Sequence, residues 1–165
     1  MSLSTSAFDS LEVTVRSIIQ DKTKLAREWA ALDFNGNGKV SLAEVDRWVT
    51  DSYPLLNNKP ALMRAFKKTL VDGDGSDWVE KKEFISLLKN LFYFNRLWNV
   101  FDEIDTSDDR RIDFAEFSAG VNKVGLNIPA EQLRIEFDTI DANRGGQILF
   151  DEFCIWVIGK KIPVD

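Results

Sequence analysis

Four stretches of twelve residues carry oxygen-bearing side chains at a spacing that suits a hard cation. They begin at Asp33, Asp72, Asp105 and Asp141, and each has Asp at its first position and Glu at its twelfth. Calcium takes about six to eight oxygens, which a twelve-residue loop supplies from positions 1, 3, 5, 7, 9 and 12 around a sharp turn at position 6. The pattern therefore predicts calcium binding, with magnesium as the competing ion at the same oxygens.

The candidate ligands share these positions, the one at position 7 being a backbone carbonyl. They are Asp33, Asn35, Asn37, Lys39, Ser41 and Glu44 in the first loop; Asp72, Asp74, Ser76, Trp78, Glu80 and Glu83 in the second; Asp105, Ser107, Asp109, Arg111, Asp113 and Glu116 in the third; and a reduced set of Asp141, Asn143, Gln147 and Glu152 in the fourth.

The first two loops differ in how completely they match the pattern. The first, DFNGNGKVSLAE, has an oxygen at every ligand position and Gly38 at the turn. The second, DGDGSDWVEKKE, has Asp77 at the turn, and Asp tolerates left-handed backbone better than most residues. Its entering helix carries Lys68 and Arg64 where the other units have apolar residues, which indicates a helix that ends differently. Whether this second loop binds an ion is left open.

The third and fourth loops depart from the pattern in opposite ways. The third, DTSDDRRIDFAE, is rich in carboxylates but has Arg110 at the turn, which costs roughly 1–2 kcal/mol, or about five- to thirtyfold in affinity. We expect its four carboxylates to outweigh that cost. The fourth, DANRGGQILFDE, has Gly145 and Leu149 at positions 5 and 9 and so lacks two ligands. We expect a structural role for it.

The spacing of the loops predicts the fold class. Their starts lie 39, 33 and 36 residues apart, from 33 to 72, 105 and 141, which fits a repeated helix, loop and second helix. A β-branched residue at position 8 of each loop can pair with the neighbouring loop: Val40, Val79, Ile112 and Ile148. We predict an all-α fold of four helix–loop–helix units in two paired lobes, with short β pairing between loops.

Composition excludes several classes of site. The chain has 165 residues, 27 Asp and Glu against 21 Lys and Arg, no His and one Cys. A net charge of −6 argues against nucleic-acid binding, which needs clustered positive charge. Without His, imidazole-based zinc sites and catalytic triads are impossible, and Cys154 alone forms no internal disulfide. No phosphate-binding loop or nucleophile motif is present, so we expect no enzymatic activity.

The segments around the loops suggest the domain organisation. Residues 1–21 form an amphipathic helix that either packs on the body or fills a groove between open helices, and we favour packing. We assign the first pair of units to residues 22–92 and the second to 93–165. Between Glu80 and Asp102 there is no Gly or Pro and apolar residues are dense. A helix that is apolar on most sides should be buried, so we expect the two lobes to pack together.

The four loops resemble those of the EF-hand (calmodulin-like) superfamily across residues 20 to 160. The segment EFISLLKNLFYFNRLWNVFDEID, which ends at Asp105, and the run DEFCIW after the fourth loop resemble the flagellar calcium-binding proteins of trypanosomes, the calflagins. That resemblance implies a compact EF-hand protein, calcium sites in the two C-terminal loops and a place in the flagellum. Calflagins are acylated near the N-terminus, whereas this chain has Ser2 and no Cys there, so we expect no membrane anchoring.

Two functions remain open. The leading one is an intracellular calcium sensor or buffer, which we expect to be cytoplasmic because neither a secretory signal nor a bilayer-spanning stretch is visible. We also expect it to be a monomer. The alternative is a structural adaptor bound constitutively to a cytoskeletal or axonemal partner. Two Met against twelve Phe and five Trp favour one dedicated protein partner over many.

Overall fold

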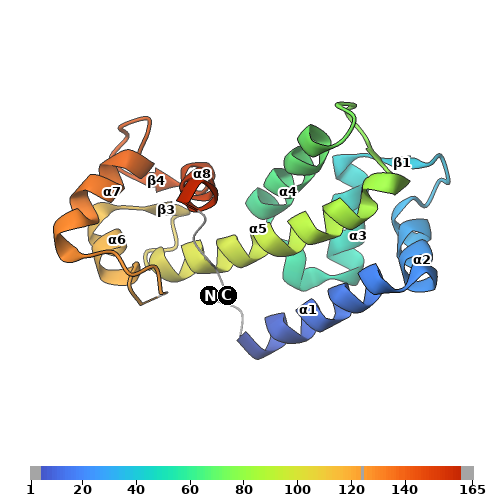
Figure 1. Cartoon of the computed structure of the whole chain (residues 1–165), viewed down its shortest axis with the longest axis horizontal. Helices are drawn as coiled ribbons and strands as arrows, with labels where there is room; N and C mark the ends of the chain where they lie inside the picture. Colours follow the sequence, from blue (N-terminus) through green and yellow to red (C-terminus); the bar gives the residue numbers. More distant parts are fainter. Residues whose placement is uncertain (1–4, 124, 161–165) are drawn as a thin grey trace. The chain divides into compact units, whose positions relative to one another are not determined.

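A computed structural model describes residues 5–123 and 125–160 of the chain. Its helices are α1 (Thr5–Gln20), α2 (Lys22–Leu32), α3 (Leu42–Ser52), α4 (Lys59–Asp72), α5 (Phe84–Ile104), α6 (Phe114–Gly120), α7 (Leu133–Ile140) and α8 (Phe150–Lys160). Short 3-10 turns lie at Pro54–Leu56, Lys81–Glu83 and Ala130–Gln132. Four helix–loop–helix units follow one another along the chain (Figure 1), and the predicted all-α fold is confirmed.

The loops pair through two-residue strands, as the residues at position 8 predict. Strands β1 (Lys39–Val40) and β2 (Val79–Glu80) are antiparallel, with Val40 opposite Val79. Strands β3 (Arg111–Ile112) and β4 (Ile148–Leu149) are also antiparallel, with Ile112 opposite Ile148. All four of these aliphatic side chains are fully buried. Each pair of loops is therefore held together by a small apolar contact beside its ligand positions.

Contacts divide the chain after Asn95, within α5, into two compact units. The N-terminal unit, described from residue 5 to Asn95, contains the first two loops, and the C-terminal unit, from Arg96 onward, contains the other two. Each unit has its own aromatic core. Phe84 lies at the centre of the first and Phe153 at the centre of the second, both almost fully buried. The expectation that the two lobes pack together stays a prediction.

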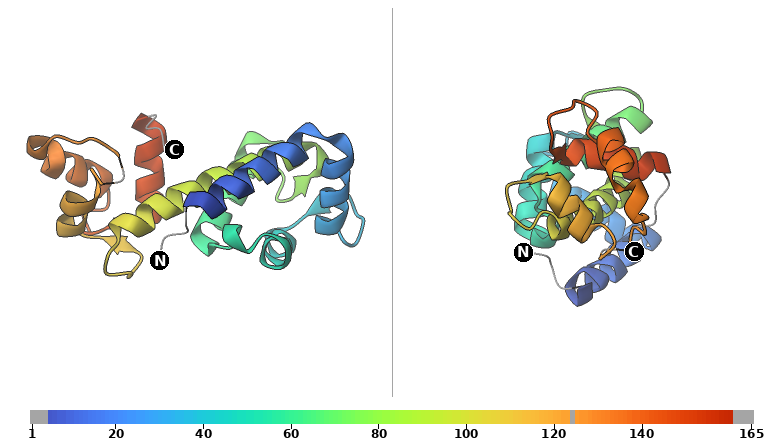
Figure 2. Two further views of the ribbon diagram at one scale, coloured as in Figure 1. Left: turned by 90° about the horizontal axis from the view of Figure 1, so that it is seen from below. Right: turned by 90° about the vertical axis from the view of Figure 1, so that its left-hand side faces the viewer.

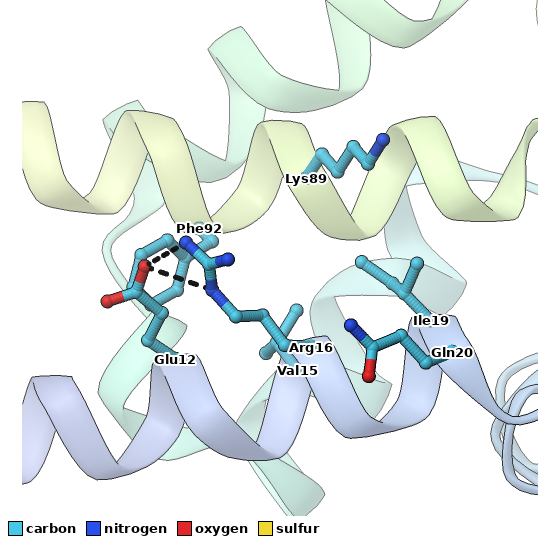
Figure 3. A pocket seen from close by; sticks show the side chains of 7 residues that line it. All are labelled: Glu12, Val15, Arg16, Ile19, Gln20, Lys89 and Phe92. Atoms are coloured by element: carbon cyan, nitrogen blue, oxygen red, sulfur yellow. Dashed lines mark hydrogen bonds and ion pairs between the residues drawn. The ribbon is translucent and has the colours of Figure 1, made fainter.

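Helix α1 packs on the body of the N-terminal unit. It buries Leu11, Val15 and Ile18, and the ring of Phe8 lies 4.6 Å from that of Phe92. Figures 1 and 2 show α1 running beside the first half of α5. A groove of about 390 Å³ remains between the two helices, and Figure 3 shows residues that line it, among them the ion pair of Arg16 with Glu12. The helix that we expected to precede the first loop is confirmed.

No helix in the described ranges 5–123 and 125–160 has both the length and the apolar character required to span a bilayer.

Candidate metal sites

The closing glutamate occupies the same place in all four loops. The backbone N–H at position 9 donates to Oε1 of the Glu at position 12 in every case. These donors are Ser41, Glu80, Asp113 and Leu149, at 3.0, 2.9, 3.0 and 3.0 Å from Glu44, Glu83, Glu116 and Glu152. The bond belongs to the cap of the exiting helix, so helix capping and ligand placement are fixed by one side chain.

Loop 1 (residues 33–44) has the backbone that the sequence predicts. Helix α2 ends at Leu32, and the buried Asp33 accepts the N–H of Gly38 at 2.8 Å. Gly36 and Gly38 have φ values of 70° and 84°, a region that glycine enters without strain. The amide oxygen of Asn37 accepts the N–H of Lys39 at 3.2 Å. The loop therefore curls around the position that an ion would take.

Two carboxylate oxygens of loop 1 stand out. Oδ1 of Asp33 and Oε2 of Glu44 are buried and have no hydrogen-bond donor among the described residues. In loops 2, 3 and 4 the second oxygen of the closing Glu accepts the N–H at position 3, from Asp74, Ser107 and Asn143. An unpartnered buried carboxylate oxygen is costly unless a cation meets it. Loop 1 therefore presents the acceptors that calcium would satisfy.

Loop 3 (residues 105–116) brings three carboxylates together. Carboxylate oxygens of Asp105, Asp109 and Glu116 lie within 4.8 Å of one another, and Asp105 and Glu116 are buried. Burial raises the pKa of Asp105, and the neighbouring Asp109 adds to that rise. For Glu116, burial pushes the pKa upward, but the N–H groups of Asp113 and Ser107 outweigh it and the pKa is lowered. A divalent cation would relieve the repulsion within this group.

The turn of loop 3 uses two residues in the left-handed region. Asp108 and Arg110 have φ values of 59° and 65°. The predicted left-handed backbone at Arg110 is therefore confirmed, and its N–H donates to Asp105 Oδ2 at 2.7 Å, as Gly38 does to Asp33. Asp105 Oδ1 accepts the hydroxyl of Ser107 at 3.2 Å. Loop 3 has the same fold as loop 1 but holds its carboxylates with its own donors.

Loop 2 (residues 72–83) enters differently from the others. Helix α4 continues through Asp72 and is capped by Gly73, so Asp72 lies on the helix, about half exposed, and pairs with Lys68 at 2.8 Å. Positive φ occurs at Gly75 but not at Asp77, so the expectation that Asp77 would take left-handed backbone is wrong. The physical reason is the longer helix, because it moves the start of the loop and the turn that follows. The structure does not turn Asp72 toward the other candidate ligands.

The remaining acids of loop 2 gather around a lysine. Carboxylate oxygens of Asp74, Glu80 and Glu83 lie within 4.8 Å of one another. The Lys82 ammonium lies 3.2 Å from Glu80 and 3.9 Å from Asp74. A Cβ on Gly73 would lie 1.5 Å from Glu83 Oε2, so only glycine lets Glu83 close here. Lys82 is not among the residues that the ligand pattern predicts, although a lysine beside the closing Glu is visible in the sequence.

Two further ligand positions of loop 2 are engaged within the loop. The Ser76 hydroxyl donates to the carbonyl of Trp78 at 2.8 Å. The N–H of Ser76, followed by its side chain, lowers the pKa of Asp74, and Lys82 adds to this effect. Loop 2 thus satisfies its acids with its own donors and its own cation.

Loop 4 (residues 141–152) is closed by its own backbone. Asp141 accepts the N–H of Gly145 at 3.1 Å and that of Gly146 at 2.8 Å. Asn143 also accepts the N–H of Gly145, at 2.9 Å. The side-chain amide oxygen of Gln147 accepts from Arg111 of loop 3 at 3.4 Å. With no side-chain oxygen on Gly145, loop 4 offers few acceptors to an ion and contributes strand β4 to the pair.

Comparisons with known proteins agree with this geometry. Residues 94–158 match the EF-hand domain pair family, so loops 3 and 4 form an EF-hand pair. The chain is similar to the flagellar calcium-binding protein of Trypanosoma cruzi (29% identical over 166 residues; 91% of this chain, 79% of the relative). It is also similar to flagellar calcium-binding protein TB-17 of Trypanosoma brucei brucei (29%; 88% and 67%). The predicted resemblance to these proteins is confirmed.

A similarity to solved structures also exists at low identity. The homologue of programmed cell death 6 protein from Leishmania major Friedlin aligns with 81% of this chain and 70% of its own, at 19% identity and a TM-score of 0.46.

Proposed function

We propose that this EF-hand protein binds calcium in loops 1 and 3, while loops 2 and 4 serve as their structural partners. The observation that carries the proposal is the pair of buried, unpartnered oxygens in loop 1, Asp33 Oδ1 and Glu44 Oε2. They come from positions 1 and 12, the first and last ligands of a calcium loop. A bound cation removes the cost of leaving both without a partner.

Loop 3 supports the proposal through its charge. Asp105, Asp109 and Glu116 bring three carboxylates together, and Asp113 stands at the fourth acidic ligand position. A divalent ion is attracted to all four, and it offsets the burial and the repulsion from Asp109 that raise the pKa of Asp105. Calcium suits this loop better than magnesium, which requires near-ideal octahedral geometry and gives up its water reluctantly.

The names of the relatives support a role in calcium binding. Two proteins similar to this chain over most of its length are called flagellar calcium-binding proteins. We therefore propose the flagellum as the location to examine first, by tagging the chain in a flagellated cell. Signal confined to the cell body would contradict this location without touching calcium binding.

Calorimetric titration of metal-free protein with calcium, in millimolar magnesium and physiological salt, tests the function. We expect two sites. Glu44→Gln and Glu116→Gln should each remove one of them, because an amide replaces the closing carboxylate and weakens binding by about 3 kcal/mol, or roughly a hundredfold. Glu152→Gln in loop 4 is the matched control and should leave both sites in place. No binding by the unaltered protein would overturn the proposal and leave a structural role.

The same titration with an apolar fluorescent dye separates a sensor from a buffer. A sensor exposes apolar surface when calcium reorients the exiting helices, so dye fluorescence rises with site occupancy. A buffer fills its sites with little change in dye fluorescence.

A further inference from the structure

The exiting helix of loop 1 holds a buried donor beside its buried acceptor. Trp48 lies one turn after Glu44 on α3, and its side chain is 4% exposed. Its indole Nε1–H has no acceptor among the described residues, and Glu44 Oε2 has no donor. Residues four apart on a helix share one face. One face of α3 therefore carries a buried donor and a buried acceptor, and neither has a hydrogen-bond partner.

The two side chains also line one pocket. The pocket has a volume of about 140 Å³ and lies between the end of α2 and helix α3, with Glu44 and Trp48 in its wall. Phe34 and Arg47 also line it, and the Arg47 guanidinium lies 4.9 Å from the centre of the Phe34 ring. The free volume leaves room for the Glu44 carboxylate to rotate. The indole has less freedom, because its ring packs edge-on against Phe84 and Tyr53 at 5.9 and 5.1 Å.

Loop 4 contains the matching arrangement with a different outcome. Trp156 follows Glu152 by four residues, as Trp48 follows Glu44. Its indole donates to Glu136 on α7 at 2.9 Å, and Glu152 Oε2 accepts the N–H of Asn143 at 3.2 Å. Both groups of loop 4 are therefore satisfied separately. The indole at this position of loop 4 therefore donates to a carboxylate of its own unit.

In the first unit the corresponding carboxylate does not bind the indole. Glu28 precedes Asp33 by five residues, as Glu136 precedes Asp141, but it does not accept the indole N–H of Trp48. Burial, followed by the neighbouring Glu28, raises the pKa of Tyr53. The Trp48 indole therefore has no acceptor among the described residues of α2. On its own helix, four residues before it, Glu44 Oε2 is a buried carboxylate oxygen that also lacks a partner.

We propose that Trp48 is a positioning residue for calcium binding in loop 1, whose indole N–H donates to Oε2 of the closing ligand Glu44. The proposal rests on the calcium site proposed for loop 1. A carboxylate oxygen has two lone pairs, so Oε2 can accept this bond and face the ion at once. With Ser41 donating to Oε1, the bond fixes the plane of the carboxylate in the bidentate orientation that calcium requires.

Trp48→Phe tests the role in the full chain. Phenylalanine keeps a ring against Phe84 but removes the N–H. Groups that hydrogen-bond a ligating side chain are worth about 10- to 100-fold in metal affinity, and we expect roughly a tenfold loss in loop 1 with loop 3 unchanged. The Gly38 amide resonance reports occupancy of loop 1. The matched control, Trp156→Phe, removes the bond to Glu136 and should leave loop 1 unaffected. Unchanged loop 1 affinity in Trp48→Phe would overturn the proposal.

The indole resonance gives a second readout that a purely structural role would not move. Trp48→Phe identifies the Trp48 indole signal by its loss. In the unaltered protein this signal should shift in step with the Gly38 amide as calcium is added, and a stationary signal would contradict the proposal. In chelator, Glu44→Gln should move the Trp48 indole signal and leave that of Trp156 in place. This last result judges the Trp48–Glu44 contact even if loop 1 of the unaltered protein binds no calcium.

Discussion

Loops 1 and 3 form the same turn, but they differ in the number of carboxylates and in the residues that take left-handed backbone. Loop 1 has two carboxylates among its ligand positions and glycine at the two left-handed positions, with φ values of 70° and 84°. Loop 3 has four carboxylates, but Asp108 and Arg110 occupy those positions at 59° and 65°. Left-handed backbone costs a non-glycine residue roughly 1–2 kcal/mol. One loop is therefore easy to fold and sparsely charged, while the other is strained and densely charged.

The two units repeat this contrast in their total charge. Up to Asn95 the chain has 13 basic and 13 acidic side chains, whereas from Arg96 onward it has 8 basic and 14 acidic ones. The whole net charge of −6 therefore belongs to the C-terminal unit. Calcium in loop 3 offsets part of the negative charge of the C-terminal unit, whereas calcium in loop 1 adds positive charge to a neutral unit. Affinity in the two loops should depend on different features.

Exchanging one carboxylate between the loops should have the largest effect. Asn37→Asp and Asp109→Asn alter the same ligand position in opposite directions. We expect each change to shift calcium affinity by about 1.4 kcal/mol, or tenfold, upward in loop 1 and downward in loop 3. Calorimetry of the two variants measures the shifts. If neither variant differs from the unaltered protein in calcium affinity, charge at this position does not distinguish the two loops.

Backbone strain should appear in folding stability. Arg110→Gly removes a left-handed side chain at the cost of extra freedom in the unfolded chain, and we expect the free energy of unfolding of the C-terminal unit to rise by about 1 kcal/mol. Gly38→Ala in loop 1 should lower stability by about 1–2 kcal/mol, because its φ of 84° is unfavourable for alanine. Thermal unfolding in chelator measures both changes. A loss of stability in Arg110→Gly would mean that the guanidinium makes contacts worth more than the strain.

The sequence was sufficient for features that depend on spacing. Four loops, their pairing through residues at position 8 and the left-handed backbone at Arg110 all follow from the twelve-residue repeat. The ligand pattern predicted the wrong backbone for Asp72 and Asp77. The residue at which α4 ends depends on the stability of the helix, on the Lys68–Asp72 pair and on the cap at Gly73, and the ligand pattern contains none of these. The unpartnered oxygen of Glu44 could not be predicted from the sequence either, since it depends on which hydrogen-bond donors lie near it in the folded chain.

Replacing Lys82 should have the smallest effect of these changes. It tests the feature that distinguishes loop 2, a lysine among its acidic side chains. Lys82→Gln removes the ammonium beside Glu80 and Asp74, so the lowered pKa of Asp74 should rise toward its usual value. The rise should be partial, because the Ser76 N–H is the larger cause of the lowering and remains in place. An acid whose pKa is lowered by folding stabilises the fold above its unfolded pKa, and this stabilisation is lost as the pH falls through the folded value.

Titration of the Asp74 carboxyl resonance in chelator measures the shift, and Lys81→Gln is the matched control on the neighbouring residue. The side chain of Lys82 is 69% exposed, so solvent screens the pair and the change in stability should be too small to move the unfolding temperature. The same variant shows whether the ammonium blocks an ion. If Lys82 takes the place of calcium, Lys82→Gln should give loop 2 weak calcium binding that the unaltered protein lacks. If loop 2 of the variant still binds no calcium, the lysine is not what prevents binding. The cause is then the position of Asp72, which lies on the extended helix α4 and is missing from the ligand set.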